Sequence, residues 1–172
     1  MAVSSSQEER VRLRELYRPD EIHVLFVGEG PPHGGTFFYR RDSKLYEATM
    51  EAFRRCVPGS RTGSFLERFR DLGCYLEDLC ADSVEQWGTD DPRRVSARGA
   101  GEAPLAKRIA GLPLRQVFVV ETAIEPYVRR ALEAAGHDGV PVVVTVFPHG
   151  GQSATEYRER LEAPLRDLFA AP

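Results

Sequence analysis

Four short apolar runs recur along the chain and predict the strands of one sheet. They cover residues 22–27, 74–80, 116–121 and 140–147. The first run is rich in β-branched and aromatic residues and too short for a helix, which is the pattern of a strand buried on both faces. The second run is less apolar than the first, so we expect it nearer an edge of the sheet or ending in a site.

The segments between these runs carry apolar residues at helical spacing. The predicted helices cover residues 7–17, 43–56, 64–72, 105–110, 122–136 and 153–168. Four of them begin with a hydroxyl residue that can cap a helix, namely Ser43, Ser64, Thr122 and Ser153. Residues 81–101 show no clean period, and we predict a long loop there, of a kind that is commonly functional or mobile.

The order of the elements predicts a parallel sheet with helices on both faces. Apolar strands alternate with helices along the whole chain, and connections of this type cover both sides of a sheet. We therefore expect an α/β protein, a three-layer α/β/α sandwich around a central, mostly parallel four-stranded sheet. A chain of 172 residues suits a single domain over residues 1–172, with residues 1–20 as an N-terminal helical extension.

The composition of the chain bears on where the protein is located and on which cofactors it could hold. No run approaches the ~20 apolar residues of a membrane span, and the start of the chain lacks a secretory apolar core. We expect a cytoplasmic monomer that does not associate with membranes. Cys56, Cys74 and Cys80 form no CxxC pair, which favours buried thiols over a disulfide framework or a zinc site. No metal or cofactor is expected.

The charged residues neither indicate nor exclude nucleic-acid binding. The net charge of −3 and the pI near 5.9 do not indicate it. Basic residues nevertheless gather at Arg40, Arg41, Lys44, Arg93, Arg94, Arg98, Lys107 and Arg108. If they share a face they could hold phosphates, and otherwise they form a solvated surface.

Two glycine-containing turns carry the best candidates for chemistry. Gly28-Glu29-Gly30 follows the first apolar run and His149-Gly150 follows the last. In a parallel sheet both turns emerge at the edge where ligands bind. Glu29 could position a water molecule and His149 could donate a hydrogen bond. The alternatives are that Glu29 only accepts from backbone N–H groups and that His149 is satisfied locally.

The first turn does not fit the common phosphate-binding loops. The third glycine of a GxGxxG motif would fall at His33, two prolines block a helix start, and no GK[ST] follows. Three aromatic residues come directly after it, Phe37, Phe38 and Tyr39. Such residues are usually core, but one beside a catalytic loop can stack on a nucleobase.

The run VLFVGEGPPHGGTFF resembles the first motif of the uracil-DNA glycosylase superfamily. In that motif a strand ends in a turn of the GQDPYH, GINPG or GEAPG type, and a phenylalanine that stacks on the flipped base follows. YLEDLC and VTVFPHGGQS occupy the places of the family's second strand and of its histidine loop. The similarity in order extends over residues 22–168, and the first motif is its most specific part.

The resemblance implies a role for each matched residue. Glu29 would position the attacking water, Phe37 or Phe38 would stack on the base, Asp78 would read the base edge and His149 would donate to the departing base. The implied catalytic residues are Glu29 and His149, and the implied substrate-binding residues are Gly28, Gly30, Phe37, Phe38 and Asp78. A carboxylate near the sugar and a donor near the base suit the charges that develop as an N-glycosidic bond breaks.

Three features depart from the family pattern. Pro148 precedes His149 instead of following it, and Asp78 stands where the family has an amide. A carboxylate only accepts hydrogen bonds, so Asp78 suits an exocyclic amine or a ring N–H and would repel a carbonyl oxygen of uracil. The branch with a GEAPG motif uses four cysteines for an iron–sulfur cluster, and this chain has three.

These observations predict a hydrolase that cleaves the N-glycosidic bond of a modified base in DNA, either uracil or another deaminated base. Its substrate would be single-stranded DNA or a damaged duplex. The alternative is a non-catalytic module that binds a nucleotide, a nucleic acid or a protein on the same fold, which the acidic balance and the altered histidine loop favour. A different hydrolase that uses the same crevice is a third possibility.

Overall fold

The computed structural model describes residues 5–170 and contains one four-stranded parallel sheet. Its strands are β1 (Val24–Gly28), β2 (Cys74–Asp78), β3 (Gln116–Val119) and β4 (Val142–Val144). The order across the sheet is β2-β1-β3-β4, and all three pairings are parallel. The prediction of a parallel four-stranded sheet is confirmed, as is the place of the second strand at an edge.

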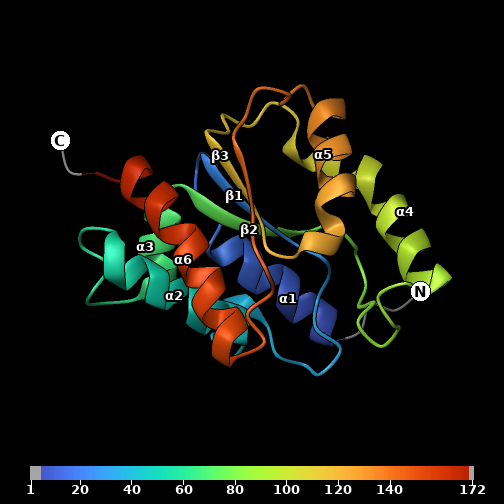
Figure 1. The fold of residues 1–172 in the computed structure, drawn as a ribbon, viewed down its shortest axis with the longest axis horizontal. Helices are drawn as coiled ribbons and strands as arrows, with labels where there is room; N and C mark the ends of the chain where they lie inside the picture. Colours follow the sequence, from blue (N-terminus) through green and yellow to red (C-terminus); the bar gives the residue numbers. More distant parts are fainter. Residues whose placement is uncertain (1–4, 171–172) are drawn as a thin grey trace.

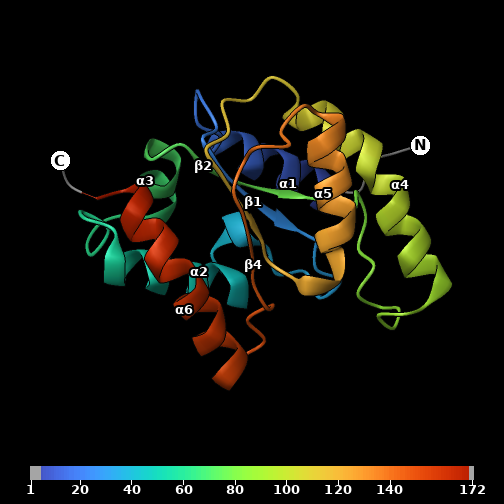
Figure 2. The ribbon, with the colours of Figure 1, turned by 45° about the horizontal axis from the view of Figure 1, so that its top comes forward.

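Helices cover both faces of this sheet and give three layers (Figure 1). They are α1 (Ser5–Leu16), α2 (Lys44–Cys56), α3 (Phe65–Asp71), α4 (Pro92–Ile109), α5 (Glu125–Ala134) and α6 (Gly151–Leu168), with short 3-10 helices η1 (Phe38–Arg40) and η2 (Thr122–Ile124). Helices α2, α3 and α6 lie on one side, and α4 and α5 pack together on the other, as Figure 2 also shows. The predicted α/β/α sandwich is therefore the observed architecture.

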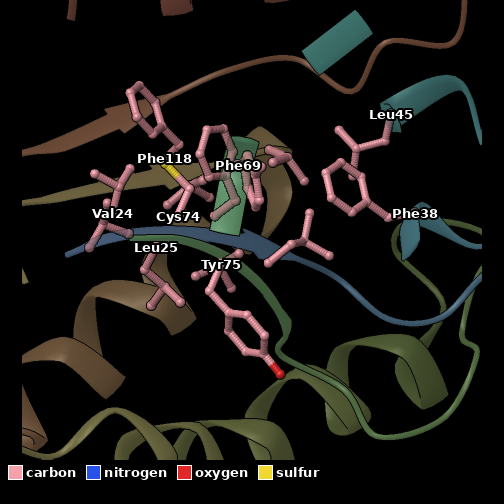
Figure 3. Packing of buried hydrophobic residues seen from close by; sticks show 14 of the residues in the cluster. Val24, Leu25, Phe38, Leu45, Phe69, Cys74, Tyr75 and Phe118 are labelled. Carbon is pink, nitrogen blue, oxygen red and sulfur yellow. The ribbon is translucent and has the colours of Figure 1, made fainter. Parts of the chain in front are cut away.

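Alternating side chains of the strands fill the two halves of the core. Phe26 and Phe118 stack with ring centroids 4.7 Å apart, and Phe69 of α3 packs on Phe26 at 5.4 Å. Leu25 and Tyr75 point to the opposite face (Figure 3). Because all five positions of β1 are buried, apolar residues are required on both faces of this strand.

The open edge of β2 is covered by a tyrosine hydroxyl. Tyr39 Oη accepts a hydrogen bond from Leu76 N at 2.7 Å and donates one to Leu76 O at 3.0 Å. An unpaired strand edge otherwise exposes such groups to other chains. Tyr39 also belongs to η1, so this contact fixes the segment that follows the glycine-rich turn.

Two of the four predicted helix caps are present. Ser43 Oγ accepts from Tyr46 N at 3.1 Å and Ser64 Oγ accepts from Glu67 N at 3.4 Å. The other two predictions are wrong. Thr122 begins η2 and donates to Thr145 O, while Ser153 lies inside α6 and donates to Gly150 O. The Thr122 hydroxyl binds the carbonyl oxygen of the residue after β4, and the Ser153 hydroxyl binds that of the residue before α6, instead of a helix N–H group.

The prediction of a loop over residues 81–101 is wrong beyond Asp91, where α4 begins. Asp91 caps the helix through a bond from Arg93 N at 2.9 Å. Apolar periodicity fails here because arginines occupy the first two turns of the buried face. Glycine is needed on the same face, since a Cβ on Gly101 would lie 2.3 Å from Leu79 O. The buried face of α4 consists of Arg94, Arg98, Gly101, Leu105, Ala106 and Ile109.

The remaining expectations concern membranes and cysteines. Within residues 5–170, no helix is long and apolar enough to span a membrane. All three cysteines are free thiols, with Cys74 and Cys80 buried and Cys56 half-buried. Burial raises the pKa of each thiol, and that of Cys80 reaches about 11. Thiols with raised pKa values are poor nucleophiles, as expected of structural cysteines.

Candidate functional site

A cavity of about 530 Å³ opens where the strands end. We call it the strand-end cavity. Its wall includes residues 28–34, the end of β2, part of the loop before α4, and residues that follow β3 and β4. All seven residues singled out from the sequence line it: Gly28, Glu29, Gly30, Phe37, Phe38, Asp78 and His149. Residues from both ends of the chain meet here because parallel strands place their carboxyl ends at one edge.

Glu29 is held by two arginines of α4. Arg94 binds both carboxylate oxygens, with Nε 2.9 Å from Oε1 and Nη2 2.5 Å from Oε2. Arg98 Nε donates to Oε1 at 2.6 Å. The Glu29 side chain is 8% exposed and the Arg98 side chain 4%. Among the described residues, the hydrogen bonds to this carboxylate come from guanidinium groups, whereas a purely turn-stabilising role would require backbone N–H donors.

The two arginines determine the charge of Glu29. Burial would raise the pKa of its carboxyl, but hydrogen bonds and charge attraction from Arg94 and Arg98 outweigh this and lower the pKa. Glu29 is thus an anion throughout the neutral range. A carboxylate of this kind can stabilise a cation or orient a water molecule, while its weak basicity makes it a poor proton acceptor.

The same arginines fix the loop that precedes α4. Arg94 Nη1 donates to Trp87 O at 2.8 Å and Arg98 Nη1 donates to Thr89 O at 3.1 Å. Thr89 and Glu85 of this loop line the strand-end cavity. One wall of the cavity is therefore ordered through the ion pairs of Glu29.

Asp78 enters the cavity from the end of β2. Its Oδ2 accepts from Arg14 Nη2 at 2.6 Å, and Arg14 also binds the neighbouring Glu77 at 3.1 Å. Its Oδ1 lies 2.8 Å from the point that a Cβ on Gly28 would occupy. Burial raises the pKa of Asp78, and Arg14 opposes that rise. Gly28 is thus needed, because a side chain at this position would take the space of the Asp78 carboxylate.

Phe37 and Phe38 form an apolar wall of the cavity but are also packed in the core. Their residues are 2% and 3% exposed. Phe38 meets Tyr39 edge-on at 5.1 Å and Tyr46 at 5.9 Å. Phe37 lies below the guanidinium of Arg14 at 5.7 Å. These contacts hold both rings, and only the part of each ring that lines the cavity is open to a ligand.

His149 lies at the exposed rim of the cavity. Its ring packs on Phe147 with centroids 4.8 Å apart, and its backbone oxygen accepts from Lys44 Nζ. The following Gly150 and Gly151 both have positive φ values, of 137° and 53°. The histidine therefore sits on a tightly turned segment beside an apolar side chain and in contact with solvent.

The sequence leaves Glu121 unassigned, and it predicts that Arg94 and Arg98 hold phosphates or lie on a solvated surface, whereas the structure buries both arginines against Glu29. Glu121 lines the cavity just after β3, 3.9 Å from Arg94, and burial followed by repulsion from Glu29 raises its pKa. The apolar run places it in the strand itself, although an acidic residue at the end of such a run is a usable signal. Arg94 and Arg98 fall in the predicted loop, although their spacing of four places both on one helix face.

Most of the other basic residues bind protein acceptors. Arg40 pairs with Glu9 at 2.8 Å, and Arg41 donates to Tyr17 Oη at 2.7 Å. Arg108 donates to Asp78 O at 2.7 Å. These guanidinium groups stabilise α1, η1 and the end of β2.

Neither similarity to known proteins nor a cluster of metal-binding side chains identifies a function for the described part of the chain. No protein-family model and no curated protein matches the chain. Among residues 5–170, no group of three or more His, Cys, Asp or Glu side chains is arranged to hold a metal ion.

Proposed function

We propose that the protein is a DNA glycosylase that acts as a cytoplasmic monomer and hydrolyses the N-glycosidic bond of a modified base. The observation that carries the proposal is the shared cavity lined by Glu29, Phe38, Asp78 and His149, which come from three different strand-end segments. Its volume of about 530 Å³ lies within the usual range for small-ligand sites. Fixed aromatic rings and a few polar groups are what recognition of a flipped base requires.

The chemistry follows from the charges of the cavity. As the glycosidic bond breaks, the sugar becomes cationic and the base anionic. The Glu29 carboxylate would stabilise the sugar cation and orient water through Oε2, which accepts one of the three guanidinium hydrogen bonds. Water would then add to the sugar carbon and release its proton to solvent, while His149 at the rim would donate a hydrogen bond to the departing base anion. The buried position of Glu29 strengthens its effect because the local dielectric constant is low.

A glycosylase assay tests this proposal. Single-stranded and duplex oligonucleotides with uracil, hypoxanthine, xanthine, alkylated purines or mismatched bases are incubated with the protein, and abasic sites are detected by alkaline cleavage. We expect release from at least one substrate and a loss of about 100-fold or more in Glu29→Gln, as for other electrostatic catalytic groups. Glu133→Gln, at an exposed position of α5, serves as the control. No release from any substrate, or equal release by Glu29→Gln, would contradict the proposal.

A second candidate is a binding module without catalysis. It is favoured by the three hydrogen bonds that Arg94 and Arg98 already make to Glu29, and by the exposed place of His149. In that case oligonucleotides would bind in a salt-sensitive way and no base would be released. Binding that persists unchanged in Glu29→Gln, together with intact substrate, would select this function over the first.

A further inference from the structure

The strand-end cavity is rich in hydrogen-bond acceptors. Four carboxylates line it, those of Glu29, Asp78, Glu85 and Glu121. Among the described residues that line it, the one arginine is Arg94, and its Nε, Nη1 and Nη2 donate to Glu29 and to Trp87 O. This guanidinium is therefore already engaged. A ligand meets the four carboxylates together with side chains that can also donate, those of His33, Ser43, Gln86, Thr89 and His149.

Asp78 is the carboxylate best placed to contact a base. It is 7% exposed and pairs with Gly28 across β1 and β2, so it lies beside the end of the central strand β1. Arg14 binds Oδ2. Among the hydrogen bonds of the described residues none goes to Oδ1, which lies beside Gly28 in the cavity wall. Oδ1 is not among the fully buried side-chain atoms of the described residues that lack a partner, so a ligand donor would replace solvent at this oxygen.

On the basis of the nucleobase-binding function proposed above, we propose that the strand-end cavity selects a base that presents an exocyclic amino group. The amine would donate to Asp78 Oδ1, and the aromatic wall at Phe37 and Phe38 would hold the ring. A deaminated base has a carbonyl oxygen at the same ring position. This oxygen and the carboxylate would then be two hydrogen-bond acceptors that face each other with no donor between them. The natural substrate is then a base modified elsewhere than at its amine, and not uracil.

Matched nucleosides test the selection independently of catalysis. Isothermal titration calorimetry compares 2′-deoxycytidine with 2′-deoxyuridine, and 2′-deoxyadenosine with 2′-deoxyinosine. Each pair differs by an amine exchanged for a carbonyl oxygen. We expect the amine-bearing member to bind about tenfold more tightly, which is ~1.4 kcal/mol and the size of one unsatisfied buried polar group.

Two variants identify the residue responsible. Asp78→Asn keeps the shape and adds an N–H donor, so the preference for the amine should fall about tenfold. Glu77→Gln is the matched control, because Glu77 also binds Arg14 but does not line the strand-end cavity. Its nucleoside preference should equal that of the wild type. If Asp78→Asn fails to fold, the wild-type preference still decides the proposal.

Several outcomes would overturn the inference. They are equal or tighter binding of the carbonyl-bearing nucleosides, no binding of any of the four, and the same change of preference in Asp78→Asn and Glu77→Gln. The glycosylase reaction can fail separately. An amine preference without base release would contradict catalysis and leave the selection intact.

Discussion

Arg94 binds Glu29 through two parallel hydrogen bonds, from Nε to Oε1 at 2.9 Å and from Nη2 to Oε2 at 2.5 Å. This bidentate geometry is the strongest form of a carboxylate contact. It joins α4 to the turn after β1, the two parts of the chain that define one wall of the strand-end cavity. Arg98 reinforces it from the next turn of the helix.

Replacing Arg94 should destabilise the fold. Arg94→Met retains much of the apolar stem but removes a guanidinium from a buried pair. We expect a loss of about 3 kcal/mol in the free energy of unfolding, at the lower end of the usual cost because Arg98 still neutralises Glu29. Urea denaturation measures it. Arg93→Met is the control, because the Arg93 side chain is 67% exposed, pairs with Asp91 and lies over the Trp87 ring at 5.2 Å. A similar loss there would show that the buried pair is not special.

The same variant should change the response to acid. Because the folded-state pKa of Glu29 lies below the ordinary 4.5, its contribution to stability is present above pH 4.5 and is lost as the pH falls through the folded-state value. Stability of the wild type should therefore decrease on acidification below pH 4.5. The decrease should be smaller in Arg94→Met, as measured by urea titrations at several pH values. Parallel curves would contradict the assignment of the lowered pKa to Arg94.

Two glycines of α4 should respond in opposite ways to alanine. Gly101→Ala would place a Cβ 2.3 Å from Leu79 O, and the forced shift should cost about 1–3 kcal/mol. A Cβ on Gly99 would meet no atom within 4 Å, so Gly99→Ala should stabilise the helix by about 0.5–1 kcal/mol. Thermal denaturation distinguishes the two. Equal effects would mean that α4 does not approach β2 as closely as described.

Gly28 should be needed for ligand binding. Gly28→Ala would bring a methyl group 2.8 Å from Asp78 Oδ1 and displace it. We expect nucleoside affinity to fall about tenfold or more, the loss of roughly one buried hydrogen bond. Gly34→Ala also lies in the cavity wall but meets nothing within 4 Å, so its affinity should match the wild type. Calorimetric titration gives both values.

Tyr39 should contribute through its hydroxyl. Tyr39→Phe keeps the ring and leaves Leu76 N and O without a partner, at a cost of about 2 kcal/mol in the free energy of unfolding. Tyr46→Phe, on a half-buried ring of α2, should change stability by less than about 0.5 kcal/mol. Chemical denaturation of both variants checks this, and equal losses would contradict a special role for the edge contact.

Local patterns in the sequence are sufficient to predict the sheet and most helices. Continuous apolar runs identify all four strands because parallel strands are buried on both faces. The strands are shorter than the runs, since apolar residues continue into the turns: Leu79 and Cys80 follow β2 and are still buried. The caps at Ser43 and Ser64 are predictable because each bonds within its own helix.

The failures come from interactions between distant segments. The first turns of α4 bury arginines whose partner, Glu29, lies 65 and 69 residues earlier. No local pattern distinguishes such a helix from a charged loop. The sequence predicts more of the candidate site than of the residues that surround it. Residues that follow parallel strands must meet at one edge of the sheet, whereas the charged residues that bind them are brought there by helix packing.

Arg94 and Arg98 each bind both Glu29 and the loop before α4. Ligand binding at Glu29 is therefore linked to the order of this loop. Both arginines bind Glu29, and in addition Arg94 binds the backbone oxygen of residue 87 and Arg98 that of residue 89. A ligand group that drew either guanidinium away from Glu29 would also release this segment from α4. The binding free energy of such a ligand would then include the entropy of freeing residues 81–91, so affinity at Glu29 and protection of that segment from hydrogen exchange would change together.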